Sequence, residues 1–212
     1  MSEEVLLYNI RNNKCIVEPN EYNVSGSEGL YHAFYRHYMC NLAKYWYKIE
    51  EAVKANETYN SSLYYLFTTD HSICLISEDN GKSFVGFVIY ATQEKFYEEP
   101  SYIRDSSEKN SCIADFMSKS VAASEMAAPK TYIAELFVHP KHRHKGIATK
   151  VVKQILANNE GPVVLEILDK NTAAKEFWRK TMSDMGMEDV TSEYPTVEND
   201  CPVHIHVFAQ KQ

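Results

Sequence analysis

The sequence predicts one mixed α/β domain, and three observations support this fold class. The chain has 212 residues, 44% hydrophobic and 24% charged, a balance typical of a globular protein with a sizeable core. Its second half runs in the order strand, helix, strand, helix, strand, strand. Strands also precede this run, and the strand–helix–strand unit requires at least one crossover between parallel strands.

The first half is expected to contain two short strands, a long helix and a hairpin. Apolar residues recur at three- and four-residue steps over 29–54, which is typical of an amphipathic helix. Residues 72–91 form two apolar runs around Glu78-Asp79-Asn80-Gly81, which favours a hairpin turn. The short strands cover 5–10 and 14–19, and the helical stripe consists of Tyr31, Phe34, Tyr35, Tyr38, Leu42, Tyr45, Ile49 and Val53.

The second half begins with a polar, irregular segment, 92–130, in which one helix is expected within 111–128. A long irregular segment inside a compact domain is typical of a lid, a binding loop or a disordered stretch. Regular structure then resumes. The expected elements are strands over 131–138 and 163–168, helices over 147–156 and 171–186, and final strands over 188–194 and 202–209.

Composition also limits the function. A net charge of −7 argues against a general role on nucleic acid. The N-terminal segment lacks the features of a signal peptide, and no stretch is long and apolar enough to span a membrane. The five cysteines are scattered, odd in number and without a CxxC pair, which indicates reduced thiols in a cytoplasmic protein.

A basic stretch, VHPKHRHKGIATKVV over 138–152, joins a predicted strand to a predicted helix. The first amides of a helix carry partial positive charge and bind phosphate readily. Gly146 would let an oxygen approach this backbone closely, and Arg143, Lys145 and Lys150 add full charges. The stretch is therefore suited to hold a pyrophosphate. Its spacing fits neither a P-loop nor a dinucleotide fingerprint.

Histidines are frequent in and beyond this stretch. His142 and His144 are too close together for a typical helical ligand pair, and no acidic residue or cysteine adjoins them. We therefore expect structural or surface roles and no metal site. The residues concerned are His139, His142, His144, His204 and His206.

The basic stretch resembles the acetyl-coenzyme A-binding motif of the GNAT N-acetyltransferase superfamily. The family signature is Arg/Gln-x-x-Gly-x-Gly/Ala after a strand that ends in Val-x-Pro. Arg143, Gly146 and Ala148 match the signature, and Val138 and Pro140 precede it.

A second motif of the same family follows in the expected helix, where an asparagine and a small residue precede an aromatic pair. The resemblance is strong over 132–186 and topological before that. The matching residues are Asn171, Ala174, Phe177 and Trp178, with Gly186 before the next strand.

The resemblance implies a GNAT-type acyl-CoA N-acyltransferase fold. A central mixed β-sheet would be flanked by helices, with an insertion between the third and fourth core strands. We expect one domain over 1–212. Residues 1–130 would form the acceptor side, with the insertion at about 92–130, and 131–212 would bind acetyl-coenzyme A.

The resemblance also implies a cofactor site without a metal. The amides from Arg143 to Thr149 would hold the pyrophosphate, and the strand from Leu136 to Val138 would pair with the pantetheine arm. An amide near Val138 would polarise the thioester carbonyl, and Asn171 would contact the pantetheine or support its strand. The implied residues are Leu136, Phe137, Val138, Arg143, His144, Lys145, Gly146, Ile147, Ala148, Thr149, Asn171, Ala174 and Trp178.

Glu135 is the one carboxylate in the predicted strand 131–138 and shares a face with Ile133 and Phe137 by alternation. A carboxylate in this neighbourhood of the family often removes the proton of the attacking amine, directly or through water. The alternative is a hydrogen-bonded structural glutamate.

Trp178 departs from the family pattern, because many members have a tyrosine there that protonates the leaving thiolate. An indole cannot act as that acid. The role is therefore absent or moved, and Tyr90, Tyr132 and Tyr194 are the candidates.

The expected activity is transfer of an acetyl group from acetyl-coenzyme A to a primary amine on a small cationic molecule, such as a polyamine or an aminoglycoside. A protein or peptide amine and a non-catalytic acyl-coenzyme A sensor are the alternatives, and a homodimer is allowed for. Tyr31, Tyr35, Tyr38 and Trp46 are candidates to face the acceptor, with Tyr31 and Tyr35 preferred, although such a stripe is more often core.

Overall fold

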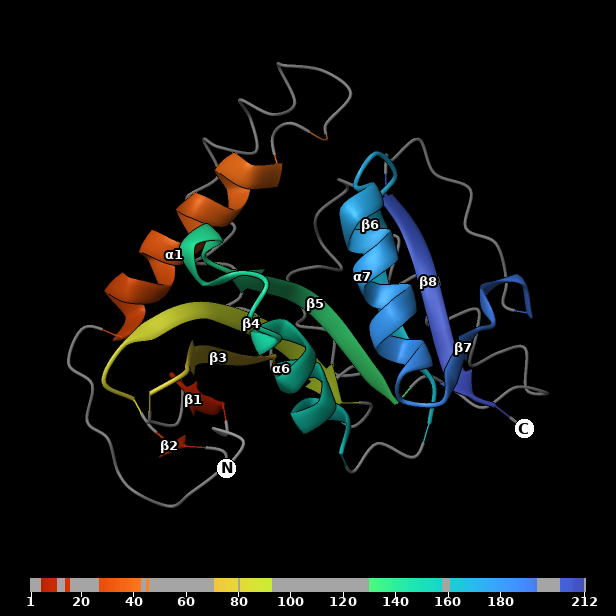
Figure 1. The fold of residues 1–212 in the computed structure, drawn as a ribbon, viewed down its shortest axis with the longest axis horizontal. Helices are drawn as coiled ribbons and strands as arrows, with labels where there is room; N and C mark the ends of the chain where they lie inside the picture. Colours follow the sequence, from red (N-terminus) through yellow and green to blue (C-terminus); the bar gives the residue numbers. More distant parts are fainter. Residues whose placement is uncertain are drawn as a thin grey trace, which may run out of the picture. The chain divides into compact units, whose positions relative to one another are not determined.

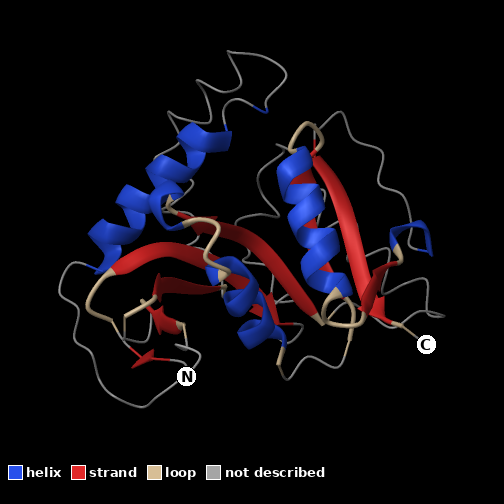
Figure 2. Cartoon of the chain, viewed as in Figure 1, coloured by secondary structure: helices blue, strands red, loops and turns tan. Residues whose placement is uncertain are grey.

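The computed structural model describes residues 5–10, 14–15, 27–42, 45, 71–79, 81–92, 130–157, 161–193 and 203–211. They belong to two compact units, of which the first comprises Met1–Tyr90 and Ala134–Ala157 and the second Ala91–Ile133 and Asn158–Gln212. Both units combine helices and strands (Figures 1 and 2). The predicted mixed α/β fold, with a mixed sheet flanked by helices, is confirmed.

The first unit contains the strand order β2-β1-β3-β4-β5. Strand β1 (Leu6–Asn9) pairs antiparallel with both β2 (Lys14–Cys15) and β3 (Ser72–Ser77). Strand β3 pairs antiparallel with β4 (Phe84–Thr92), as the predicted hairpin requires. Strand β5 (Thr131–Val138) follows in the order, and its residues from Ala134 onward belong to this unit.

A hydrophobic core joins helix α1 (Ser27–Leu42) to one face of these strands. The strand residues alternate along the chain, so they share one face of the sheet. The aromatic stripe predicted for the helix supplies the other side of the core. The buried cluster consists of Tyr8, Ile10, Tyr31, Phe34, Tyr35, Ile73, Leu75, Phe87, Ile89 and Phe137.

Strand β4 approaches β5 very closely at Gly86. A Cβ atom on Gly86 would overlap the backbone carbonyl oxygen of Phe137 and lie 3.0 Å from the Cα of Val138. The amide of His139 donates to the carbonyl of Val85 at 2.8 Å, which fixes the end of β5 against β4. Glycine is therefore required at this position for close approach of two backbones.

The second unit contains the strand order β5-β6-β8-β7. Strand β5 pairs in parallel with β6 (Val163–Leu168) over Thr131–Ile133. Strand β8 (Val203–Gln210) pairs antiparallel with β6 and with β7 (Met187–Asp189). The parallel pair confirms the predicted crossover, whose helix α6 (Ile147–Leu156) belongs to the first unit.

Two predicted elements end earlier than expected. Helix α1 ends at Leu42, and Tyr45 lies in a 3₁₀ turn; most of 43–54 is outside the described residues. The strand predicted over 188–194 is wrong at 190–193, because the Asp189 carboxylate accepts from the amide of Thr191 at 3.0 Å and a 3₁₀ turn follows over Thr191–Glu193. Tyr194 lies outside the described residues. The predicted insertion lies almost wholly outside the described residues.

Candidate functional site

Strand β5 carries the predicted catalytic carboxylate on the face that meets helix α1. Glu135 and Leu136 are half-buried, whereas Phe137 and Val138 are buried. The ring of Phe137 contacts those of Phe34 and Phe87, with centroids 6.3 and 5.9 Å apart. Glu135 therefore lies at the edge of an aromatic core and on the same face as Phe137, as alternation predicted.

Helix α1 supplies the partner of this carboxylate. The hydroxyl of Tyr38 donates a hydrogen bond to Oε2 of Glu135, across 97 positions in the sequence. Tyr31 and Tyr35, the tyrosines preferred as acceptor contacts, are 0% and 5% exposed and belong to the core cluster. Tyr38, from the same stripe, is half-buried.

The basic stretch forms a 3₁₀ turn, a short loop and the start of α6. The turn covers Pro140–His142. His144 and Gly146 have φ angles of +63° and +76°, a left-handed conformation that costs free energy for a histidine but not for a glycine. Apart from its chain neighbours, no described heavy atom lies within 4 Å of the position that a Cβ on Gly146 would take. The backbone at Gly146 is thus open to a ligand.

Arg143 connects this loop back to β5. Its Nε donates to the carbonyl oxygen of Val138 at 2.9 Å, and its guanidinium lies 5.8 Å from the centroid of Phe137. Its own amide donates to the carbonyl of Pro140 at 3.3 Å. Arg143 therefore holds the loop on the end of the strand, and the amides from His144 onward are better placed than its own for a ligand.

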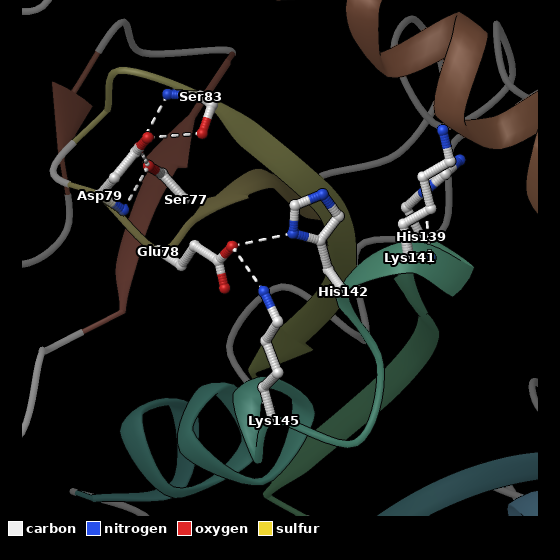
Figure 3. A network of polar contacts seen from close by, with 8 residues as sticks. All are labelled: Ser77, Glu78, Asp79, Ser83, His139, Lys141, His142 and Lys145. Atoms are coloured by element: carbon white, nitrogen blue, oxygen red, sulfur yellow. Dashed lines mark hydrogen bonds and ion pairs between the residues drawn. The ribbon is translucent and has the colours of Figure 1, made fainter.

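The β3–β4 turn faces the basic loop with a carboxylate (Figure 3). Oε1 of Glu78 lies 2.8 Å from Nδ1 of His142 and 3.3 Å from Nζ of Lys145. These contacts, the His142 hydrogen bond first, lower the pKa of Glu78. Ser83 binds the neighbouring Asp79 through its amide at 2.7 Å and its hydroxyl at 2.5 Å, which fixes the turn that carries Glu78.

A cavity of about 400 Å³ lies beside this network and the first turn of α6. Lys145 and Lys150 bring two positive charges to it, and the carboxylates of Glu78 and Asp79 bring two negative charges, with Glu78 in contact with Lys145. An anion that reached this cavity would meet the start of a helix and two lysines, with the two carboxylates on the turn opposite. The lining residues are Val5, Glu78, Asp79, Lys145, Ile147 and Lys150.

The histidines of the loop form ring contacts. The ring centroid of His139 lies 5.5 Å from that of His37 and 6.2 Å from that of His142. Partial burial lowers the pKa of His139, and nearby cationic side chains lower it further. Within the described ranges, no group of three His, Cys, Asp or Glu side chains could hold a metal ion.

Helix α7 (Thr172–Ser183) starts at the second predicted motif. The Oδ1 of Asn171 accepts from the amide of Ala174 at 3.2 Å, so Asn171 is the helix cap. Trp178 is 8% exposed, and its ring centroid lies 5.1 Å from that of Phe177. Asn171 therefore caps its own helix, and Trp178 is a buried residue of that helix.

Two of the three tyrosines considered as a general acid are described. Burial raises the pKa of Tyr90 to about 12, which makes it a weaker proton donor than an exposed phenol. The Tyr132 hydroxyl donates to Oε2 of Glu166 at 3.1 Å, and burial raises the pKa of that carboxyl. Tyr194 lies outside the described residues.

One family profile covers all the features described above, namely β5, Gly146, α6 and the Asn171 motif. A profile of the acetyltransferase (GNAT) family matches residues 31–183. The chain belongs to the GNAT acetyltransferase family. GNAT proteins use acetyl-coenzyme A, so the chain is an acetyl-coenzyme A-dependent N-acetyltransferase. The match begins at Tyr31, about a hundred residues before the part in which the sequence motifs are strong.

Comparison with solved structures supports the fold in one case. The chain is similar to a Corynebacterium glutamicum protein described as histone acetyltransferase HPA2 and related acetyltransferase, with 11% identity, 100% and 98% of the two chains covered and a TM-score of 0.53. It is also similar to an acetyltransferase from Thermus thermophilus, with 12% identity, 96% of each chain covered and a TM-score of 0.49.

A third similar structure is a diaminobutyrate acetyltransferase from Paenibacillus lautus in complex with L-2,4-diaminobutyric acid and coenzyme A. It has 11% identity, 71% and 76% of the two chains covered and a TM-score of 0.40. No curated protein sequence matches the chain significantly. None of the described helices is long and apolar enough to cross a membrane.

The GNAT motif residues separate into two groups. The first unit brings together Glu135, the end of β5, the loop and the first turn of α6; the second brings together Asn171, Ala174 and Trp178 on α7. Sequence reasoning missed Glu78 as a partner of the loop. A partner 64 or more positions away has no local signal, since only the fold brings the β3–β4 turn to the loop.

Proposed function

We propose that the chain acetylates a primary amine on a small cationic molecule, of the polyamine or aminoglycoside type, by direct attack in a ternary complex. One observation carries this proposal: Glu135 presents a half-buried carboxylate on β5, at the edge of an aromatic core. A carboxylate attracts an ammonium group, and low solvent exposure strengthens that attraction. The net charge of −7 also favours a cationic acceptor.

The proposed cofactor contacts start at the end of β5. The backbone from Leu136 to Val138 would pair with the pantetheine arm. The amides from His144 to Thr149 would hold the pyrophosphate, supported by the open backbone of Gly146 and by the charges of Lys145 and Lys150. Arg143 would keep the loop on the strand. Asn171, Ala174 and Trp178 remain proposed contacts from the second motif.

The proposed chemistry needs a neutral amine. An alkylamine has a pKa of about 10.4, roughly three units above neutral pH, so a base must take its proton. Glu135 would accept it, directly or through water, while an amide near Val138 polarises the thioester carbonyl. Attack forms the C–N bond, and loss of the C–S bond releases coenzyme A as a thiolate. That thiolate is a fair leaving group, which makes a tyrosine in place of Trp178 dispensable.

The remaining parts of the proposal concern organisation. We propose a single acetyltransferase domain over 1–212, in a cytoplasmic protein that works as a monomer or a homodimer. The scattered, odd set of cysteines supports the reducing compartment. Tyr31 and Tyr35 are proposed to shape the acceptor side through the core that positions Tyr38 and Glu135.

The test is release of coenzyme A in the presence of polyamines, aminoglycosides, amino acids and peptides with free N-termini. The proposal expects the highest kcat/KM for a compound of the first two classes. Preference for peptides would support the peptide-amine alternative. Binding of acetyl-coenzyme A without turnover of any amine would support a sensor.

Glu135→Gln tests the base within the same assay, since it keeps the shape and removes the charge. We expect kcat to fall by about 100-fold or more, with acetyl-coenzyme A affinity unchanged and partial recovery at high pH. Glu166→Gln is the matched control, because it makes the same chemical change on β6, in the second unit. Wild-type rates for Glu135→Gln at every pH would remove Glu135 as the base.

A further inference from the structure

We propose that Tyr38 is the positioning residue for Glu135 and that its hydroxyl holds the carboxylate in the orientation that receives the amine proton. This inference rests on the proposed function, since it concerns the same carboxylate. The two side chains come from different elements, helix α1 and strand β5, and both belong to the first unit. The contact therefore depends on the fold of that unit alone.

The contact itself is a charge-assisted hydrogen bond. The Tyr38 hydroxyl donates to Oε2 of Glu135. Such bonds to an ionised group are about twice as strong as those between neutral groups. The terminal torsion of a glutamate has a broad energy minimum, so the carboxylate does not fix its own orientation. A donor that grips one oxygen supplies that orientation.

The ring of Tyr38 is held by three other aromatic rings. Its centroid lies 5.9 Å from Tyr35, 5.7 Å from Phe87 and 5.9 Å from Phe137, and it meets the first two in edge-to-face arrangements of 67° and 89°. Those three rings are at most 5% exposed. A ring packed in this way cannot turn its hydroxyl away from Glu135 without disturbing the core.

This support has a consequence for proton transfer. A carboxylate offers about four acceptor positions on its two oxygens, and a single phenol hydroxyl can use one of them. Fixing the base before the substrate binds removes an entropic cost from the activation free energy. A small displacement of the base lowers the rate strongly. Tyr38 would thus act on the rate through Glu135, without touching the acceptor.

Tyr38→Phe tests this role cleanly, because it keeps the packed ring and removes only the hydroxyl. With the best amine from the coenzyme A-release screen, we expect kcat/KM to fall by about 10- to 100-fold. Acetyl-coenzyme A affinity, measured by calorimetry, should not change. The acidic limb of the pH–rate profile should move to higher pH, because the phenol's hydrogen bond favours the ionised carboxylate.

A double-mutant cycle with Glu135→Gln decides whether Tyr38 acts through Glu135. We expect Tyr38→Phe to change the rate of the Glu135→Gln enzyme by less than about twofold, because the base is already absent. Tyr8→Phe is the matched control. It removes a hydroxyl from another ring of the same core, on β1, and should leave kcat/KM and the pH profile as in wild type.

Three outcomes would overturn the inference. Tyr38→Phe with wild-type kcat/KM and an unmoved acidic limb would show that the contact has no kinetic role. An equal loss in both backgrounds of the cycle would show that Tyr38 acts independently of Glu135. A wild-type protein that acetylates no amine would overturn the proposed function along with the inference. The first two results leave wild-type turnover and its dependence on Glu135 intact, so the failures are distinguishable.

Discussion

Helices α6 and α7 start in chemically different ways. The start of α7 is capped by its own sequence, because the side chain of Asn171 accepts from the amide of Ala174 at 3.2 Å. Helix α6 starts at Gly146, which has no side chain to offer and leaves open space where one would lie. One helix start has a side-chain cap, and the other lacks one and is available to an external anion.

The two helix starts carry the two GNAT sequence motifs, and this difference indicates that the motifs have different roles. Both belong to the signature of a cofactor site, yet the α6 start has the features of a binding surface and the α7 start those of a structural one. Trp178, further along α7, is also buried, which agrees with a structural role for this motif. Substitutions at the two starts should therefore differ in kind: those at α6 should change affinity, and those at α7 should mainly change stability.

The largest effect is expected at Gly146. Gly146→Asp puts a carboxylate at the open helix start, where it would cap the first amides and repel a phosphate. We expect acetyl-coenzyme A affinity to fall by about 100-fold or more, measured by calorimetry. Gly146→Asn is the matched control, since it tolerates the left-handed backbone and lacks the charge, and it should bind better than Gly146→Asp. Unchanged affinity in a folded Gly146→Asp protein would remove the α6 start as the pyrophosphate site.

Trp178 should give the largest change in stability. Trp178→Ala removes a buried indole and should lower the free energy of unfolding by about 3–5 kcal/mol, measured by denaturant titration. Trp178→Tyr keeps an aromatic ring and adds a phenol at the position where many GNAT proteins have one. It should keep or raise turnover. An unchanged melting temperature for Trp178→Ala would contradict the packing role.

Asn171 tests the helix cap directly. Asn171→Ala should cost about 1 kcal/mol of stability, because the amide of Ala174 loses its acceptor. Asn171→Asp keeps the acceptor and should retain most of that stability. Calorimetry with acetyl-coenzyme A tests whether Asn171 acts only as a cap. If both variants lose affinity to the same extent while only the alanine variant loses stability, Asn171 also contacts the cofactor.

Glu166 should give the smallest effect, confined to the pH dependence of stability. Burial raises the pKa of its carboxyl in the folded protein, so the folded state binds this proton more tightly than the unfolded state. The contribution of the Glu166 carboxyl to the free energy of unfolding is complete below its pKa in the unfolded protein. It is lost as the pH rises through its pKa in the folded protein. Glu166→Gln should remove that loss, seen as a flatter plot of unfolding free energy against pH. Slower turnover in this variant would give the second unit a kinetic role.

The sequence predicts the parts of the molecule that depend on neighbouring residues. The hairpin around Asp79, the start of α6 at Gly146 and the cap at Asn171 are each set within a few positions of the chain. Their residue types have specific local chemistry, such as a positive φ or a short side chain that accepts from a helix amide. The aromatic stripe of α1 is likewise a periodic signal.

The contacts that complete the candidate site depend on the fold instead. Tyr38 meets Glu135 across 97 positions, and nothing in the stripe distinguishes it from the more buried Tyr31 and Tyr35. The depth of a ring in a core is set by the strand opposite it, in this case Phe87 and Phe137. Glu78 reaches the basic loop for the same reason. Side-chain chemistry alone does not reveal such partners.

Gly86 bears on how mutational scans of this enzyme should be interpreted. Every side chain at this position would overlap the backbone of Phe137, whatever its polarity or size, so a saturation library should lose all variants there. The loss of every substitution at one position is also what a catalytic residue would show. The amount of folded protein in the cell distinguishes the two cases. It falls when a side chain prevents β4 from approaching β5, and it stays the same when only a catalytic residue is lost. A library scored by survival alone would place Gly86 in the active site.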